Sequence, residues 1–587
     1  MLQKTKACHL LLLTILVSFS CQSQQFIITP DMTTPFEKNT NYSASYDEVI
    51  TYYKNLADRF SEITVSEFGM TDIGKPLHVV VVSDKGIKVA SEIDRKHKTV
   101  LLINNAIHPG EPCGVDASMM LVRDLVTKPS SKDFLSKTVV VIIPVYNIGG
   151  ALNRSGTSRV NQEGPEQYGF RGNAQNLDLN RDFIKCDSKN AASFNQLFTQ
   201  WNPDIFIDNH TSNGADYQYT ITLIPTQKDK LATPLSGFLS EQLLPELYRK
   251  MKVKNWEMCP YVYAQTTPDK GIAAFLDLTR YSSGYAALNH TISFMPETHM
   301  LKPYEDRVKS TYAFMESMLE FLSNNGTQLK EAKAKAIQLS KEKEAFDIQW
   351  EMDNDKVDSI NFKGYEAEYK PSEVSGLDRL YYDRNAPFEK KIPFYTHYKS
   401  SLSIKKPTAY IIPQAYHKII ERMQWNGVVV EQLTADEMME VEMYSIQDYK
   451  TTENAYEGHY MHYDVTVKKN NRQQQYRAGD FILKTNQAKN RYIIETLEPE
   501  APDSWFAWNF FDGILMQKEF FSAYVFEDLA AEILKNDEVL AKTLADKRKG
   551  DETFAKSAQA QLDFVYKNSK HFEWTYQLYP VGRVVDK

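Results

Sequence analysis

The chain has 587 residues and a formal net charge of −8, and hydrophobic residues make up 42% of it. A single hydrophobic core usually stops growing at about 250–300 residues, so we expect more than one domain. This apolar content excludes a largely disordered chain. The acidic balance argues against a nucleic-acid partner, because nucleic-acid-binding proteins usually carry a basic face.

The N-terminus has the features of an export signal. Lys4 and Lys6 precede an apolar run, residues 10–17, that is too short to span a membrane. The residues up to Cys21 resemble a bacterial lipoprotein signal, in which the cysteine is acylated. We therefore predict a signal peptide over residues 1–21 and a lipid on Cys21, with ordinary cleavage after Ser20 as the alternative. The mature protein is then expected in the periplasm or cell envelope, in contact with the membrane only through that lipid, or otherwise secreted.

Strand-like and helix-like segments alternate over the first half of the chain. A helical apolar spacing marks residues 114–126, and apolar runs, one of them almost continuous, mark the strands. Such alternation is typical of an α/β fold with a mixed, mostly parallel sheet flanked by helices, which we predict for residues 40–323. The expected helices are residues 46–57, 114–126 and 304–322, and the expected strands are residues 77–82, 99–107, 139–144, 204–208 and 291–295.

The composition changes after residue 323. Asn324, Asn325 and Gly326 predict the end of a helix, and residues 324–345 read as a helical connector, solvated rather than partner-binding. Short β-branched and aromatic runs then predict a β-rich C-terminal domain over residues 346–587. Within it we expect strands near residues 409–412, 428–430 and 463–467, and helices near residues 417–423 and 524–534.

Two histidines and a glutamate stand where predicted strands end. His108 and Glu111 follow the strand at residues 99–107, and His210 follows the strand at residues 204–208. The carboxyl ends of strands are where α/β sheets bind ligands. Imidazole nitrogens and a carboxylate are ligands that zinc favours, and a catalytic zinc needs three of them. Each histidine taken alone would more often be structural, but together they predict a metal site.

Two further motifs contain polar residues that could bind a substrate or take part in catalysis. Asn180 and Arg181 lie in an unusual polar string, and a guanidinium can bind a carboxylate through two parallel hydrogen bonds, although a surface salt bridge is the simpler interpretation. Glu297 ends another apolar run. A glutamate in a partly dry pocket can act as a general base, although a lone one at a strand end is usually solvated.

These motifs, in this order, resemble the carboxypeptidase A-like zinc metallocarboxypeptidase family over about residues 46–322. The resemblance implies one zinc ion per chain, bound by His108, Glu111 and His210, with Glu297 as general acid/base. It also implies that Asn180 and Arg181 bind the terminal carboxylate of the substrate. In addition it implies an arginine that polarises the scissile carbonyl and a loop tyrosine that closes over the substrate. For the arginine we prefer Arg159 to Arg171, and for the tyrosine Tyr281 to Tyr285.

The function expected from the resemblance is removal of the C-terminal residue of peptides that end in a free carboxylate. One alternative is a cell-wall peptide hydrolase or amidase of the same mechanism. The other is a catalytically silent surface-binding protein, which the intact set of motif residues disfavours. No CxxC pair is present, so a cysteine zinc site is not expected.

Overall fold

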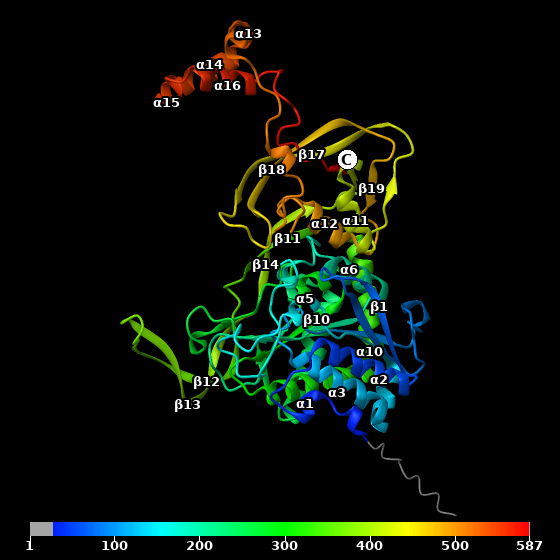
Figure 1. Ribbon diagram of the computed structural model, residues 1–587. Coiled ribbons are helices and arrows are strands. Elements are labelled where there is room, and N and C mark those ends of the chain that lie inside the picture. The colour runs from blue at the N-terminus through cyan, green and yellow to red at the C-terminus, as the bar shows by residue number, and fades with distance from the viewer. Residues whose placement is uncertain (1–27, 586–587) are drawn as a thin grey trace, which may run out of the picture.

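The computed structural model describes residues 28–585, so the predicted signal peptide and Cys21 lie outside the described residues. Figure 1 shows a lower body built around a large sheet, a β-rich domain above it and a small helical bundle at the far upper end. Within the described residues, no helix is both long enough and apolar enough to cross a membrane.

A nine-stranded mixed sheet forms the centre of the lower body. Its strands run in the order β1-β2-β4-β3-β5-β10-β7-β8, and the short β6 pairs with β10. The middle strands β4, β3, β5 and β10 are parallel to one another. Strand β2 is antiparallel to β1 and β4, and β7 is antiparallel to β10 but parallel to β8, which confirms the predicted mixed α/β fold. The strands are β1 (Ile63–Met70), β2 (Pro76–Val82), β3 (Thr99–Asn104), β4 (Thr138–Ile143), β5 (Ile205–Asp208), β6 (His210–Ser212), β7 (Ile221–Pro225), β8 (Met258–Pro260) and β10 (Ile292–His299).

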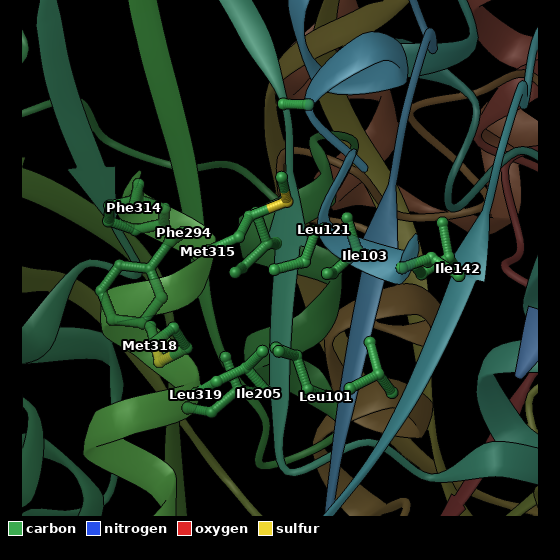
Figure 2. Packing of buried hydrophobic residues seen from close by; sticks show 14 of the residues in the cluster. Leu101, Ile103, Leu121, Ile142, Ile205, Phe294, Phe314, Met315, Met318 and Leu319 are labelled. Carbon is green, nitrogen blue, oxygen red and sulfur yellow. The ribbon is translucent and has the colours of Figure 1, made fainter. Parts of the chain in front are cut away.

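The apolar strands are buried on both faces because alternate side chains point to opposite sides of the sheet. In β3, Leu101 and Ile103 enter one hydrophobic cluster, whereas Val100 and Leu102 enter the other. Figure 2 shows the first cluster, where side chains of α10 and α3 pack onto the sheet strands. This two-sided burial explains why the strands read as continuous apolar runs.

Helices and the C-terminal domain cover the sheet. The first face is covered mainly by α2, α3, α8 and α10, and the second by α6, α9 and part of the C-terminal domain. The helices of the lower body are α1 (Pro35–Lys38), α2 (Tyr46–Arg59), α3 (Cys113–Thr127), α4 (Lys132–Lys137), α5 (Ile148–Leu152), α6 (Lys189–Trp201), α7 (Thr233–Gly237), α8 (Leu244–Val253), α9 (Ser282–Leu288) and α10 (Tyr304–Glu342).

The predicted helix end at Asn324–Gly326 is wrong. Helix α10 continues without a break over 39 residues, so it includes the predicted connector. The side chains of Asn324 and Asn325 donate to backbone carbonyls four residues earlier, and Gly326 lets the helix approach Thr99 at the start of β3. The later half of α10 is not merely solvated, since Lys333 is buried and donates to the carbonyl oxygen of Pro203.

A long β-hairpin from the predicted C-terminal domain packs against the lower body instead. Strand β12 (Asp358–Pro371) pairs with β13 (Asp378–Tyr395), and β13 adds the short β9 (Ile272–Ala273) of the lower body. Phe362 and Ile392 at the base of the hairpin share a hydrophobic cluster with Tyr217, Tyr219 and Cys259. Figure 1 shows the hairpin projecting to the left of the lower body.

The β-rich domain is built on a six-stranded sheet in the order β16-β19-β15-β20-β17-β18. Its buried side chains continue the second cluster of the lower body, so the two domains share a core. The remaining elements are β11 (Ala345–Met352), β14 (Tyr398–Lys405), β15 (Ala409–Ile412), α11 (His417–Trp425), β16 (Glu431–Gln432), β17 (Glu437–Thr451), β18 (His462–Tyr476), β19 (Phe481–Lys484), α12 (Asn490–Leu497), α13 (Ala523–Asn536), α14 (Glu538–Gly550), α15 (Glu552–Ala555), α16 (Ala558–Lys567) and β20 (Gly582–Val584).

The predicted strand at residues 428–430 is not formed. The side chain of Gln487 accepts from the backbone N–H of Val429 and donates to its carbonyl oxygen, so these groups are satisfied without a partner strand. A short strand begins only at Glu431. The predicted strand at residues 409–412 and the helices at residues 417–423 and 524–534 are confirmed.

Candidate active site

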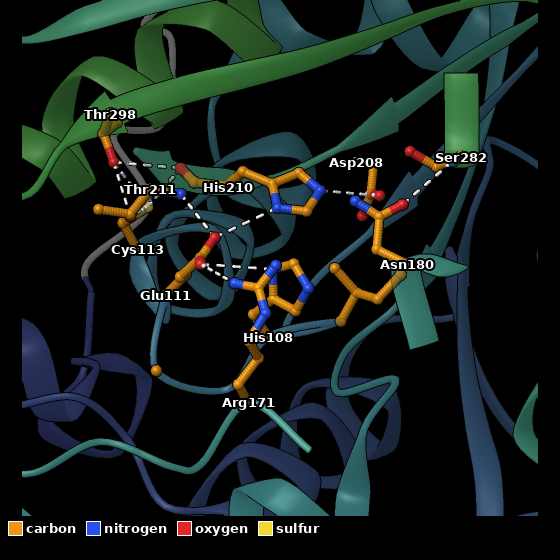
Figure 3. Close-up of polar contacts among 12 residues, drawn as sticks. His108, Glu111, Cys113, Arg171, Asn180, Asp208, His210, Thr211, Ser282 and Thr298 are labelled. Carbon is orange, nitrogen blue, oxygen red and sulfur yellow. Dashed lines mark hydrogen bonds and ion pairs between the residues drawn. The ribbon is translucent and has the colours of Figure 1, made fainter. Parts of the chain in front are cut away.

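His108, Glu111 and His210 converge on one point. Strand β3 ends at Asn104, and a tight turn follows in which the backbone N–H of Glu111 donates to the carbonyl oxygen of His108. His210 begins β6, immediately after the adjacent strand β5. All three side chains are buried, and one ligand atom from each lies within 4.8 Å of the others. The structure thus brings together the three residues that the sequence analysis selected (Figure 3).

Two aspartates fix the orientation of the histidine rings. Nε2 of His108 lies 2.8 Å from the Asp178 carboxylate, and Nε2 of His210 lies 3.0 Å from the Asp208 carboxylate. Nδ1 of each ring therefore faces Glu111, at 3.3 Å from His108 and 3.2 Å from His210. A carboxylate behind a ligating imidazole is the usual arrangement around protein-bound zinc.

The charges around this cluster favour a cation. Burial acts to lower the pKa of His210, but Asp208 and Glu111 outweigh it and hold that pKa well above its usual value. Nδ1 of His108 is buried and makes no hydrogen bond within the described residues. Two imidazole nitrogens and a carboxylate oxygen suit zinc, so the donor set fits this metal. A catalytic site would keep a further coordination position open.

Glu297 lies beside the cluster because of strand pairing. Strands β6 and β10 are parallel, and Glu297 is the register partner of His210. Partners in such a pair project to the same face of the sheet. Burial raises the pKa of Glu297 to about 7, although the positive charge of a protonated His210 opposes the shift. A carboxyl group with this pKa can exchange a proton near neutral pH.

Asn180, Arg181 and Tyr281 form a second group on the wall of the same cavity. The short 3₁₀ helix Leu179–Arg181 places Asn180 and Arg181, and the Asp178 side chain caps this helix by accepting from the N–H of Asn180. Tyr281 immediately precedes α9. The side-chain oxygen of Asn180 accepts from the backbone N–H of Ser282. The Arg181 guanidinium lies 4.5 Å from the centre of the Tyr281 ring.

Tyr285, the alternative loop tyrosine, is in a different environment. It is fully buried, and its hydroxyl donates to the Asn426 side chain in the shared core. Only Tyr281 of the two lines the cavity. A residue packed as tightly as Tyr285 has no route to a substrate.

The two candidate arginines both line the cavity but differ in their free donors. Arg159 donates from Nε to Gln162, from Nη1 to Glu111 and from Nη2 to the carbonyl oxygen of Thr211. Arg171 donates from Nε to Asp178 and makes a long contact from Nη1 to Glu111 at 3.4 Å. Its side chain is 44% exposed, against 15% for Arg159, and its Nη2 donates no hydrogen bond within the described residues.

The cavity has a volume of about 550 Å³ and is lined by the three candidate metal ligands, Glu297, Asn180, Arg181, Tyr281 and both candidate arginines. Its remaining wall includes Tyr261, Phe275 and Met295, which the sequence analysis did not select. Asp178 and Asp208 were likewise not among the residues selected from the sequence. The spacing Asp208-x-His210 at a strand end was the available signal for Asp208, because a carboxylate two residues from a ligating histidine can reach its far nitrogen.

Comparison with known proteins agrees with this geometry. Residues 49–238 match the family model described as zinc carboxypeptidase. This part of the chain belongs to the zinc carboxypeptidase family. The matched range contains all three candidate metal ligands of the zinc carboxypeptidase domain together with Asn180 and Arg181, whereas Tyr281 and Glu297 lie beyond it.

Curated relatives named carboxypeptidase match a longer part of the chain. Carboxypeptidase 2 of Trichophyton tonsurans is 22% identical over 435 residues, which is 71% of this chain and 75% of the relative. Carboxypeptidase 2 of Trichophyton rubrum is 22% identical over 475 residues, covering 77% and 81%. The similarity therefore extends past the zinc carboxypeptidase domain into the β-rich domain.

Solved structures of the family resemble this one only in part. The metallo-carboxypeptidase from Burkholderia cenocepacia superposes with a TM-score of 0.36 at 16% identity, over 48% of this chain and 69% of that chain. Carboxypeptidase A from Helicoverpa armigera gives a TM-score of 0.36 at 15% identity, over 50% and 75%. Members of the zinc carboxypeptidase family are peptide hydrolases, and the domain described here is an enzyme of that kind.

Proposed function

We propose that this protein is a zinc-dependent carboxypeptidase that removes the C-terminal residue of peptides ending in a free carboxylate. The observation that carries the proposal is a single cavity that contains both a candidate metal site and a candidate carboxylate-binding site. The donor set His108, Glu111 and His210 stands beside Glu297, and Arg181 lies on the wall of the same cavity with Tyr281 against it. The comparisons favour neither the cell-wall hydrolase nor the silent binding protein.

The residues divide the chemistry between them. One zinc ion held by His108, Glu111 and His210 would lower the pKa of a bound water and polarise the scissile carbonyl. Glu297 removes a proton from the attacking water and returns it to the leaving amine. Asn180 and Arg181 hold the terminal carboxylate, and this restricts cleavage to the last peptide bond.

For the developing oxyanion we propose Arg171 in place of Arg159, the choice preferred from the sequence. All three nitrogens of Arg159 are occupied by Gln162, Glu111 and Thr211, which suits it to holding the Glu111 carboxylate in place. Among the described residues, none accepts a hydrogen bond from Nη2 of Arg171. A preorganised donor that meets a developing negative charge is commonly worth about 3–4 kcal/mol in the transition state.

The proposal is tested by metal content and by peptides that differ only at the C-terminus. We expect about one zinc per chain, the load of a mononuclear site, and loss of most of it in His108→Ala and His210→Ala. Free-acid peptides should be cleaved at least about tenfold faster than their amides, because a charge-assisted pair is lost with the amide. Arg181→Ala should erase that preference and keep the zinc.

Equal cleavage of free-acid and amidated peptides by the wild-type protein would contradict the carboxypeptidase proposal and indicate an endopeptidase or amidase. Retention of zinc in both histidine variants would contradict the assigned ligands. Arg181→Lys should recover only part of the preference, since a single ammonium cannot form the two parallel hydrogen bonds of a guanidinium.

We further propose export to the cell envelope with a lipid on Cys21. The support is the sequence of the first 21 residues alone, which lie outside the described residues. Cys21→Ser should release the protein from the membrane fraction and change the mature N-terminus. Unchanged membrane association of this variant would exclude the lipid anchor.

A further inference from the structure

The hairpin formed by β17 and β18 reaches down from the β-rich domain to the active site. The segment 452–461 joins the two strands, and its tip is a two-residue turn in which Glu457 and Gly458 have φ angles of 50° and 85°. Tyr456 and His459 pair on either side of that turn. Positive φ at both central residues is typical of the tightest hairpin turns, but glutamate is an uncommon residue there.

Two side chains of this turn contact residues of the candidate active site, Arg181 and Asp178. The hydroxyl oxygen of Tyr456 accepts a hydrogen bond of 3.0 Å from Nε of Arg181. The carboxylate of Glu457 accepts one of 2.7 Å from the backbone N–H of Asp178, whose own carboxylate contacts His108. One turn of the β-rich domain thus contacts both Arg181, the proposed carboxylate-binding residue, and Asp178, which orients His108.

The contact with Tyr456 determines how Arg181 is presented. Nε of Arg181 is occupied by Tyr456, and Nη1 donates to the carbonyl oxygen of Asn180 at 2.7 Å. The Tyr281 ring covers the guanidinium. Nη1 also lies 3.8 Å from the Asp178 carboxylate. These contacts fix the guanidinium plane, and within the described residues they leave Nη2 for a ligand. Orientation of this kind removes part of the entropic cost of binding.

The turn is held rigidly enough to serve this purpose. The Trp508 ring stacks on Tyr456 with an interplanar angle of 19°, and Trp508 is fully buried. The Arg280 guanidinium of the lower body lies 5.5 Å from the centre of the Tyr456 ring. His459 contacts Asp187 of the lower body at 2.7 Å. Functional side chains are positioned well when such a supporting shell fixes them.

We propose that Tyr456 is a positioning residue, by which the β-rich domain orients Arg181 for the terminal carboxylate of the substrate. The inference rests on the proposed carboxypeptidase function and adds to it a role for the second domain. Tyr456 acts through Arg181, so its effect belongs to binding of the free carboxylate and not to the chemical step.

The test is Tyr456→Phe, which removes the hydroxyl and keeps the ring against Trp508. Because a hydrogen bond to a charged group is lost, we expect KM for a free-acid peptide to rise about fivefold to tenfold, with kcat changed less than about twofold. The preference for free acid over amide should fall by the same factor. Zinc content and melting temperature should stay at their wild-type values. Tyr460→Phe is the matched control, since Tyr460 is exposed on the same segment.

A double-mutant cycle separates positioning from general packing. In an Arg181→Ala background, Tyr456→Phe should have no further effect on the free-acid to amide ratio, because the group that Tyr456 orients is gone. An equal effect in both backgrounds would overturn the inference. The inference would also be overturned if Tyr456→Phe kept the wild-type preference for free acids while Arg181→Ala abolished it. That result would leave the proposed carboxypeptidase function intact. A wild-type protein without any free-acid preference would instead overturn the proposed function, and this inference with it.

Discussion

Removal of the Asp208 carboxylate is expected to weaken zinc binding without touching a ligand. Asp208 ends β5, and its carboxylate accepts from Nε2 of His210 at 3.0 Å and from the Asn104 side chain at 3.0 Å. In Asp208→Ala the imidazole loses the group that fixes its ring and directs Nδ1 toward the metal. His210 itself, Glu111 and His108 remain in place.

The expected size of the effect follows from the position of Asp208. Loss of a carboxylate behind a ligating histidine typically lowers metal affinity about 10- to 100-fold. This corresponds to about 1.4–2.7 kcal/mol of binding free energy. Asp208→Asn should fall between wild type and Asp208→Ala, because an amide oxygen can accept from only one of the two donors while its NH₂ group faces the other.

Zinc affinity is measured by competition with a chelator of known strength, with thermal melting as a check on folding. Asp58→Ala, an exposed aspartate on α2, is the matched control and should keep wild-type affinity. Unchanged zinc affinity in a folded Asp208→Ala protein would refute the reasoning that this carboxylate orients His210.

Four further predictions concern catalysis and stability. Glu297→Gln should lower turnover at least about a hundredfold with zinc retained. In the wild type, kcat/KM should rise with pH as Glu297 ionises, with a midpoint below 7 because bound zinc would lower a pKa that burial raises to about 7; an acid limb that persists in Glu297→Gln would place the base elsewhere. Arg171→Ala should reduce kcat about 100-fold or more and lower zinc affinity less than Arg159→Ala does, whereas Arg159→Ala should mainly weaken zinc binding. The reverse pattern would restore Arg159 as the oxyanion donor. Burial raises the pKa of Asp116 to about 6, whereas in the unfolded chain its pKa is about 4. The stability of the wild type relative to Asp116→Asn should therefore decline from pH 4 to pH 6 and then level off. A melting temperature that depends on pH in the same way in both proteins would contradict this.

The candidate metal ligands could be selected from the sequence because each histidine follows an apolar run. His108 and His210 follow the adjacent strands β3 and β5 at the carboxyl edge of the sheet, where ligands bind, and Glu297 is placed by the pairing of β10 with β6. Such positions depend only on strand order and strand ends. The choice between Arg159 and Arg171 depends instead on which guanidinium nitrogens are already hydrogen-bonded, and a single amino-acid sequence does not contain that information.

The errors in chain organisation have a similar cause. The Asn324–Gly326 sequence has a low helix propensity, but packing of α10 on the sheet outweighs a cost of about 1 kcal/mol for the glycine. The hairpin β12–β13 was assigned by its position along the chain to the C-terminal domain. Its apolar residues Phe362 and Ile392 pack against Tyr217 and Tyr219. Contacts between residues so far apart in the sequence cannot be recognised from the residues around either partner.

The placement of this hairpin has a consequence for biosynthesis. A polypeptide that has emerged from the ribosome only to the end of α10 still leaves Tyr217, Tyr219 and Cys259 without their partners Phe362 and Ile392. Domains generally fold as units during synthesis, but here the unit that contains the active-site sheet is finished only after the chain has passed Tyr395, the last residue of β13. A recombinant fragment designed to stop at residue 345 would for the same reason expose an aromatic surface to water, and should aggregate where the full-length chain stays in solution.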